Sequence, residues 1–120
     1  MQAKRAAYLF GIEAEWLAAV LLRCKGYRIL ARRFSAAGGE IDLVAARGGT
    51  VIFVEVKARD SIEAARLTIT PAKCRRIGRA ARSYLARLPR LPETIRMDAV
   101  FLAPGTWPRH EQGIFDLDLN

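Results

Sequence analysis

Apolar residues recur every three or four positions near the start of the chain, as they do along one face of an α-helix. Within residues 3–25 this line includes Phe10, Ala14 and Leu21. Gly26 follows, and glycine is the residue type that most often ends a helix, because it adopts positive φ angles at little cost. The pattern predicts a helix over residues 3–25.

Beyond Gly26 the spacing changes to an alternation of apolar and polar residues, which is typical of strands. Residues 27–34 alternate in this way, and residues 40–46 and 51–59 form two further runs on either side of Gly48-Gly49. A glycine pair of this kind tolerates the positive φ angles of a tight hairpin turn. We therefore expect a strand followed by a β-hairpin centred on the two glycines.

The hairpin turn also predicts which residues face each other. If it is centred on Gly48-Gly49, Asp42 lies opposite Glu55 and Glu40 lies opposite Lys57 on one side of the ribbon. The opposite side would then be wholly apolar, with three cross-strand pairs: Ile41 with Val56, Leu43 with Val54, and Ala45 with Ile52.

The second half of the chain adds one helix and two strands. Residues 60–70 have no regular pattern and are expected to form a loop. Thr70-Pro71 resembles a helix N-cap with proline at the first helical position, and the following amphipathic pattern predicts a helix that continues to Pro89. Strands are expected at residues 95–102 and 113–119. The order αβββαββ predicts a single α/β domain with a central mixed sheet flanked by helices.

The positive charge is concentrated in one segment. The 120-residue chain has a net charge of +8, and residues 64–92 contain eight basic residues and no acidic one. Twelve residues of each sign occur in the rest of the chain, so this segment carries the whole excess. A polyanion, most simply nucleic acid, is the expected partner, although anionic lipid would also be attracted.

Much of this charge falls on the second predicted helix. No acid on that helix can pair with its basic residues, so like charges four positions apart should cost stability unless a phosphate neutralises them. A solvated charged surface is the alternative. The expected nucleic-acid-binding residues are Lys73, Arg75, Arg76, Arg79 and Arg82.

Other classes of protein are disfavoured by what the sequence lacks. No apolar run approaches the ~18 residues that cross a bilayer, and the N-terminus has no signal pattern, so a cytoplasmic protein without a membrane partner is expected. Cys24 and Cys74 are far apart and have no accompanying ligand cluster, which argues against a disulfide framework or a zinc site. His110 is expected to be a surface loop residue.

The hairpin is the candidate site of chemistry. Two opposed carboxylates such as Asp42 and Glu55 repel each other unless a cation lies between them, and Mg²⁺ prefers such hard oxygen ligands. Lys57, on the same side as Glu55, could orient a water molecule or stabilise developing negative charge. The alternative is ordinary surface ion pairing, for example between Glu40 and Lys57.

The two motifs Gly39-Glu40-Ile41-Asp42 and Val54-Glu55-Val56-Lys57 resemble the D...ExK signature of the PD-(D/E)xK nuclease superfamily, especially Holliday-junction resolvases. The whole chain is similar to the YraN-like family of uncharacterised bacterial proteins. That resemblance extends from the first helix, through GGEIDLVA and VIFVEVKAR, to TPAKCRRIGRAARSYL.

The resemblance implies a restriction-endonuclease-like fold and a set of site residues. Asp42 and Glu55 would bind Mg²⁺ or Mn²⁺, and Lys57 would assist the attacking water. Glu15 matches the acid that the first helix of this family supplies, with Glu13 the weaker candidate. Two departures from the family pattern are Ala14, where a glycine is common, and a loop after residue 59 without the usual glycine.

These observations lead to the hypothesis of a metal-dependent DNA endonuclease that acts on branched or junction DNA. A non-catalytic nucleic-acid-binding or assembly module on the same scaffold is the main alternative, and an anionic-lipid-binding protein is a third. Resolvases act as dimers, so the resemblance also implies a homodimer. Asp98 matches a family position, and a structural hydrogen bond is the preferred interpretation of it.

Overall fold

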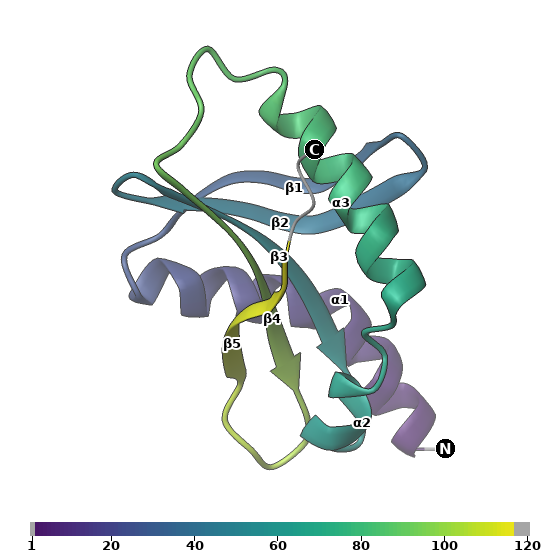
Figure 1. Cartoon of the computed structure of the whole chain (residues 1–120). Helices are drawn as coiled ribbons and strands as arrows, with labels where there is room; N and C mark the ends of the chain where they lie inside the picture. The colour runs from purple at the N-terminus through teal and green to yellow at the C-terminus, as the bar shows by residue number, and fades with distance from the viewer. Residues whose placement is uncertain (1, 117–120) are drawn as a thin grey trace.

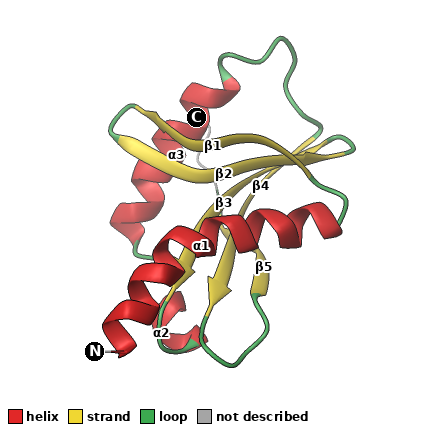
Figure 2. Ribbon diagram, turned by 180° about the vertical axis from the view of Figure 1, so that it is seen from behind, coloured by secondary structure: helices red, strands yellow, loops and turns green. Residues whose placement is uncertain are grey.

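The computed structural model describes residues 2–116, with side chains described from Glu13 onward. One mixed sheet separates two long helices, α1 on one face and α3 on the other (Figures 1 and 2). The elements in chain order are α1 (Gln2–Cys24), β1 (Arg28–Ala36), β2 (Gly39–Arg47), β3 (Thr50–Ala58), α2 (Ile62–Arg66), α3 (Pro71–Leu85), β4 (Thr94–Leu102) and β5 (Arg109–Phe115). This arrangement confirms the prediction of an α/β domain with a mixed sheet.

The strands lie in the sheet in chain order, β1-β2-β3-β4-β5. All neighbouring pairs are antiparallel except β3 and β4, whose parallel pairing requires the crossover that contains α2 and α3. The predicted turn and register are confirmed from Arg47, which pairs with Thr50, to Leu43, which pairs with Val54, and Gly48 has a φ of +59°. The predicted pairs of Asp42 with Glu55 and of Glu40 with Lys57 lie beyond this paired stretch.

Each face of the sheet has its own apolar core. On the α1 face, Leu22 packs with buried residues of β2 and β3 such as Leu43 and Val54. On the α3 face, Phe53 and Ile77 belong to a second buried cluster. The predicted apolar side of the hairpin is confirmed on the α1 face for Leu43, Ala45, Ile52, Val54 and Val56. The charged side also lies under a helix, because α3 covers it.

The strict alternation expected for β2 fails near Asp42. Ile41 and Val44 lie in the same cluster on the α3 face, whereas residues three apart in a regular strand point to opposite faces. On the neighbouring strand β1, Ala31 and Phe34 show the same spacing, and between them Arg33 has a φ of +49°. The prediction that Ile41 lies on the apolar side of the hairpin, opposite Val56, is therefore wrong, because Val56 belongs to the cluster on the other face.

Three predicted segments differ from the structure by more than two residues. The expected loop at residues 60–70 contains the short helix α2, whose N-cap Ser61 accepts a hydrogen bond from the amide of Ala64 at 3.0 Å. Helix α3 begins at Pro71 as predicted, with Thr70 as its N-cap, but ends at Leu85. Strand β5 begins at Arg109, four positions earlier than expected, and residues 117–119 of that prediction lie outside the described residues.

The turn between β1 and β2 lies directly against α3. A Cβ atom added at Gly39 would overlap the carbonyl oxygen of Arg76, so only glycine permits this approach. Arg79 holds the same turn by donating a hydrogen bond from Nε to the carbonyl of Ala37 at 3.1 Å. These contacts fix α3 opposite the beginning of β2. In the part of the chain that the structure describes, no helix is long and apolar enough to cross a membrane.

Candidate functional site

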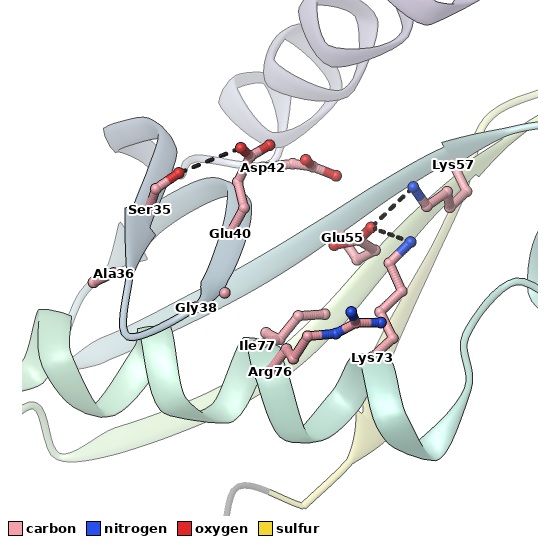
Figure 3. Close-up of a pocket in the computed structure, with 11 residues that line it drawn as sticks. Ser35, Ala36, Gly38, Glu40, Asp42, Glu55, Lys57, Lys73, Arg76 and Ile77 are labelled. Carbon is pink, nitrogen blue, oxygen red and sulfur yellow. Dashed lines mark hydrogen bonds and ion pairs between the residues drawn. The ribbon is translucent and has the colours of Figure 1, made fainter.

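A cavity of about 650 Å³ lies between α3, the β1–β2 turn and the strands β2 and β3 (Figure 3). Asp42 and Glu55 both line it, together with Lys57. The other lining residues are Ser35, Ala36, Gly38, Gly39, Glu40, Lys73, Arg76 and Ile77. The three residues of the D...ExK motif therefore reach one cavity, on the side of the sheet that α3 covers.

Glu55 is the buried centre of the cavity. Its side chain is 4% exposed, and its Oε1 atom lies 3.2 Å from Lys57 Nζ and 3.1 Å from Lys73 Nζ. Figure 3 shows the two lysines approaching this one carboxylate from different elements, Lys57 from β3 and Lys73 from α3. Glu40 and Lys57 do not form the ion pair that was considered as an alternative. Lys57 contacts Glu55, whereas Glu40 Oε2 accepts a hydrogen bond from Ser35 Oγ at 3.3 Å.

The two lysines are in different electrostatic situations. Burial lowers the pKa of Lys73, and the neighbouring Lys57 lowers it further, so that together they outweigh the opposite effect of Glu55. Burial also disfavours the charged form of Lys57, but its contacts with Lys73 and Glu55 outweigh burial and raise its pKa. Two ammonium groups that share one carboxylate account for this opposition.

Asp42 is held by the backbone of the neighbouring strand. Its Oδ2 atom accepts a hydrogen bond from the amide of Val56 at 2.7 Å. Burial, and then the negative charge of Glu55, raise the pKa of Asp42 from 3.8 to about 7, although the Val56 amide and Lys57 act in the opposite direction. A cation between the two carboxylates would remove this repulsion.

The raised pKa of Asp42 predicts a pH dependence of stability in metal-free protein. Folding favours the protonated carboxyl, so its contribution is complete below pH 3.8 and is lost as pH rises to about 7. The slope from one proton is at most about 1.4 kcal/mol per pH unit. Asp42→Asn should remove this slope, which urea unfolding of both proteins with chelator would measure. Parallel stability curves for the two proteins across this range would contradict the assignment.

Glu15 lies near this pair but has a partner of its own. Its side chain is 18% exposed, and both carboxylate oxygens accept hydrogen bonds from Arg33 Nε, at 3.2 and 3.1 Å. Its charge contributes to the raised pKa of Asp42, yet Glu15 is not among the residues that line the cavity. Glu13 is exposed on α1. Among the described residues, no group of three or more His, Cys, Asp or Glu side chains is arranged to hold a metal ion.

The residues present fit a hard divalent cation that takes few protein ligands. Mg²⁺ commonly binds through one or two carboxylates and completes its octahedron with water and substrate phosphate. Asp42 and Glu55 supply two carboxylates in one cavity, and the mutual repulsion that raises the pKa of Asp42 is what a cation would relieve. Glu15 would have to leave Arg33 before it could join them.

The basic residues of α3 divide into two groups. Lys73 and Arg76 line the cavity described above. A second hollow, of about 250 Å³, is lined on α3 by Cys74, Arg75, Gly78, Arg79 and Arg82, and on β5 and just beyond it by Phe115 and Asp116. The sequence predicted a single basic surface, and the contact between Lys73 and Glu55 was missed. The only signal for it was the position of Lys73 in the first turn of a helix that follows the strand carrying Glu55.

A second buried polar cluster lies between β4 and β5. Asp98 is fully buried, and Arg96 donates to both of its oxygens, from Nε at 2.7 Å and from Nη2 at 2.8 Å. His110 Nε2 lies 2.8 Å from Asp98 Oδ2, and the amide of Gly113 donates to Oδ1 at 3.1 Å. Burial alone would raise the pKa of Asp98, but the bonds from Arg96 and His110 lower it below its usual value.

His110 is therefore a structural residue. The prediction that it is a surface loop residue is wrong: its side chain is 1% exposed. The early start of β5 at Arg109 places it beside β4, where Lys25 Nζ lies 2.9 Å from its Nδ1 atom. The interpretation of Asp98 as a hydrogen-bonding structural residue agrees with these contacts.

Comparison with known proteins finds similarity to one protein family along nearly the whole chain. The model of "Uncharacterised protein family UPF0102" matches residues 14–102. A UPF0102 protein of Methylobacterium nodulans is 55% identical over 116 residues, which cover 96% of this chain and 90% of that protein. A UPF0102 protein of Methylorubrum extorquens is 53% identical over 116 residues, covering 96% and 91%. One from Rhodopseudomonas palustris is 49% identical over 115 residues, covering 95% and 88%.

Proposed function

We propose that this chain, which belongs to the uncharacterised protein family UPF0102, is a metal-dependent nuclease that hydrolyses phosphodiester bonds in DNA. The observation that carries the proposal is the cavity in which Asp42, Glu55 and Lys57 meet. The similarity of these residues to the D...ExK motif supports the same chemistry. The restriction-endonuclease-like fold that this similarity implies remains a prediction.

Asp42 and Glu55 would hold Mg²⁺ or Mn²⁺, which when bound acts as a Lewis acid on the phosphate and lowers the pKa of a water molecule. The protein's own groups have separate tasks. The Val56 amide fixes the orientation of the Asp42 carboxylate. Lys57, fixed against Glu55, can donate a hydrogen bond to the attacking water or to a phosphate oxygen on which negative charge develops.

Hydrolysis itself requires water to form one bond to phosphorus while the bond to the leaving sugar oxygen breaks. The water loses one proton and the leaving oxygen gains one. Because Glu55 is buried and Asp42 half-buried in the cavity wall, the charges that act on these steps lie in a medium of lower dielectric than bulk water, where each is more effective.

The outer arginines of α3 would bind the DNA backbone. Arg75→Gln is expected to weaken DNA binding severalfold and to reduce the slope of log Kd against log salt by about 1, because one phosphate contact is lost. The effect should be similar for unrelated DNA sequences, since phosphate contacts carry no sequence information. Fluorescence anisotropy at several salt concentrations measures both quantities. An unchanged salt slope would exclude Arg75 from the interface.

Branched DNA is the substrate class that the similarity to junction resolvases favours, and a homodimer follows from the same analogy. The test incubates the protein with branched, single-stranded and duplex DNA, each with Mg²⁺, Mn²⁺ or a chelator. Cleavage that requires the metal and is lost in Asp42→Asn supports the proposal. Failure to cut any of the three with either metal would contradict it.

One observation favours a second function, a nucleic-acid-binding module without catalysis. Glu55 is already neutralised by two lysines and Glu15 by Arg33, so the carboxylates have internal partners. DNA binding that depends on salt but needs no divalent metal, with no cleavage product, would identify this function instead.

A further inference from the structure

Lys73 differs from the other basic residues of α3 in what it contacts. Its ammonium group lies 3.1 Å from Glu55 Oε1, inside the cavity, and its side chain is 27% exposed. Arg76, three positions later on the same helix, also lines the cavity. Arg75 and Arg79 line the separate hollow on the other side of the helix. The basic helix therefore presents one pair of cations to the cavity and another group to the outside.

The position of Lys73 is set by the way α3 begins. Thr70 caps the helix, its Oγ1 atom accepting a hydrogen bond from the Lys73 amide at 3.2 Å, and Pro71 occupies the first turn. Side chains on a helix lean toward its N-terminus, which here lies beside the end of β3 that carries Glu55 and Lys57. Lys73 is thus directed at the strand wall of the cavity.

The charges that line the cavity balance without a bound ion. Three lining residues are acidic and three are basic, the basic ones being Lys57, Lys73 and Arg76. A divalent cation held by Asp42 and Glu55 would leave the cavity positive, which suits the entry of one phosphodiester anion. Two of the basic residues, Lys73 and Arg76, are on α3, whereas Asp42 and Glu55 are on the strands (Figure 3).

Resting on the proposed nuclease function, we propose that Lys73 is a further catalytic residue, which binds a non-bridging oxygen of the phosphate that is hydrolysed. Both lysines contact the same oxygen of Glu55, Oε1. A cation at Glu55 would repel both ammonium groups. Lys57 is two residues from Glu55 on the same strand, but Lys73 is on the opposite wall, where it can turn to a phosphate that enters between β3 and α3.

A purely structural role for Lys73 makes a different prediction. If Lys73 only neutralised Glu55, its removal would disturb Glu55 and weaken metal binding and cleavage together. If it binds the reacting phosphate, its removal lowers kcat, while metal affinity stays the same or increases because a competing cation for Glu55 has gone. The two roles are therefore separated by a measurement that does not depend on turnover.

The experiment compares wild type, Lys73→Gln and, as a control on the outer side of the same helix, Arg75→Gln. Cleavage is measured with Mn²⁺ over a range of DNA and salt concentrations, and Mn²⁺ affinity is measured separately without DNA by calorimetry. Lys73→Gln is expected to lower kcat by about 10²-fold, the usual effect of removing one preorganised donor, with Mn²⁺ affinity equal to wild type or tighter. Arg75→Gln, in contrast, is expected to raise KM and to reduce the salt dependence of KM.

The inference is overturned if Lys73→Gln keeps the wild-type kcat, or if its Mn²⁺ affinity falls in parallel with kcat. If the glutamine variant fails to fold, the same two quantities, kcat and Mn²⁺ affinity, are measured for Lys73→Arg. It keeps the positive charge and is expected to retain part of kcat, although its planar group has a different geometry. Wild type that cuts no DNA would refute the nuclease proposal itself, an outcome that is visible before any variant is compared.

Discussion

Replacing Glu55 by glutamine is expected to lower the rate of DNA cleavage on the order of 10³-fold, at the upper end of what one preorganised charged group contributes. Glutamine keeps the size of the side chain but removes its charge. The variant loses one of the two carboxylates proposed to hold the metal. It also loses the anion that positions Lys57 and Lys73, which both lie within 3.2 Å of the same oxygen.

A matched control distinguishes this effect from a general loss of structure. Glu63, on α2, has a largely exposed side chain that pairs with Arg66 and lies outside the cavity residues. Glu63→Gln makes the same chemical change and should leave cleavage unaffected. Cleavage by Glu55→Gln at a rate close to wild type, with the variant folded by circular dichroism, would exclude Glu55 from the reaction.

Asp98→Ala should produce the largest loss of stability, about 3–5 kcal/mol, the usual cost of removing one partner from a buried ion pair. The carboxylate is fully buried and accepts hydrogen bonds from Arg96 and from the amide of Gly113, with His110 Nε2 2.8 Å away. Its removal leaves the Arg96 guanidinium without its anion between β4 and β5.

Urea unfolding measures this loss, with Asp60→Ala as the control, since Asp60 is an exposed aspartate just after β3. The control is expected to change stability by less than about 0.5 kcal/mol. An Asp98→Ala effect as small as that of the control would mean that the cluster does not stabilise the fold.

The regular elements follow from patterns that depend on near neighbours. Periodicity was sufficient for α1, and Thr70-Pro71 identified the start of α3. Helix α2 was missed because five residues are too few to show a helical period, although Ser61 as N-cap and Glu63 in the first turn were available signals.

The errors in side-chain direction have a different cause. A positive φ at Arg33 is not encoded in any simple residue preference, because arginine rarely adopts it, and on β1 this angle accompanies a break in the two-residue period between Ala31 and Phe34. The burial of His110 depended on where β5 begins, and its contact with Asp98 joins residues twelve positions apart across the sheet.

In the candidate site too, contacts within one hairpin could be predicted from the sequence, and contacts between separate elements could not. Asp42, Glu55 and Lys57 could be proposed together because a two-residue turn fixes the register of one hairpin. The contacts of Lys73 with Glu55 and of Arg33 with Glu15 join separate elements, and they depend on how the helices pack on the sheet. No local pattern in the sequence determines that packing.

The most direct test of the proposed site is a crystal structure of the protein with millimolar Mn²⁺, analysed by anomalous diffraction. A metal peak in the cavity, within coordinating distance of carboxylate oxygens of both Asp42 and Glu55, is the expected result. The proposed metal site would be contradicted if no metal peak appeared near Asp42 or Glu55 and Lys57 and Lys73 were still paired to Glu55.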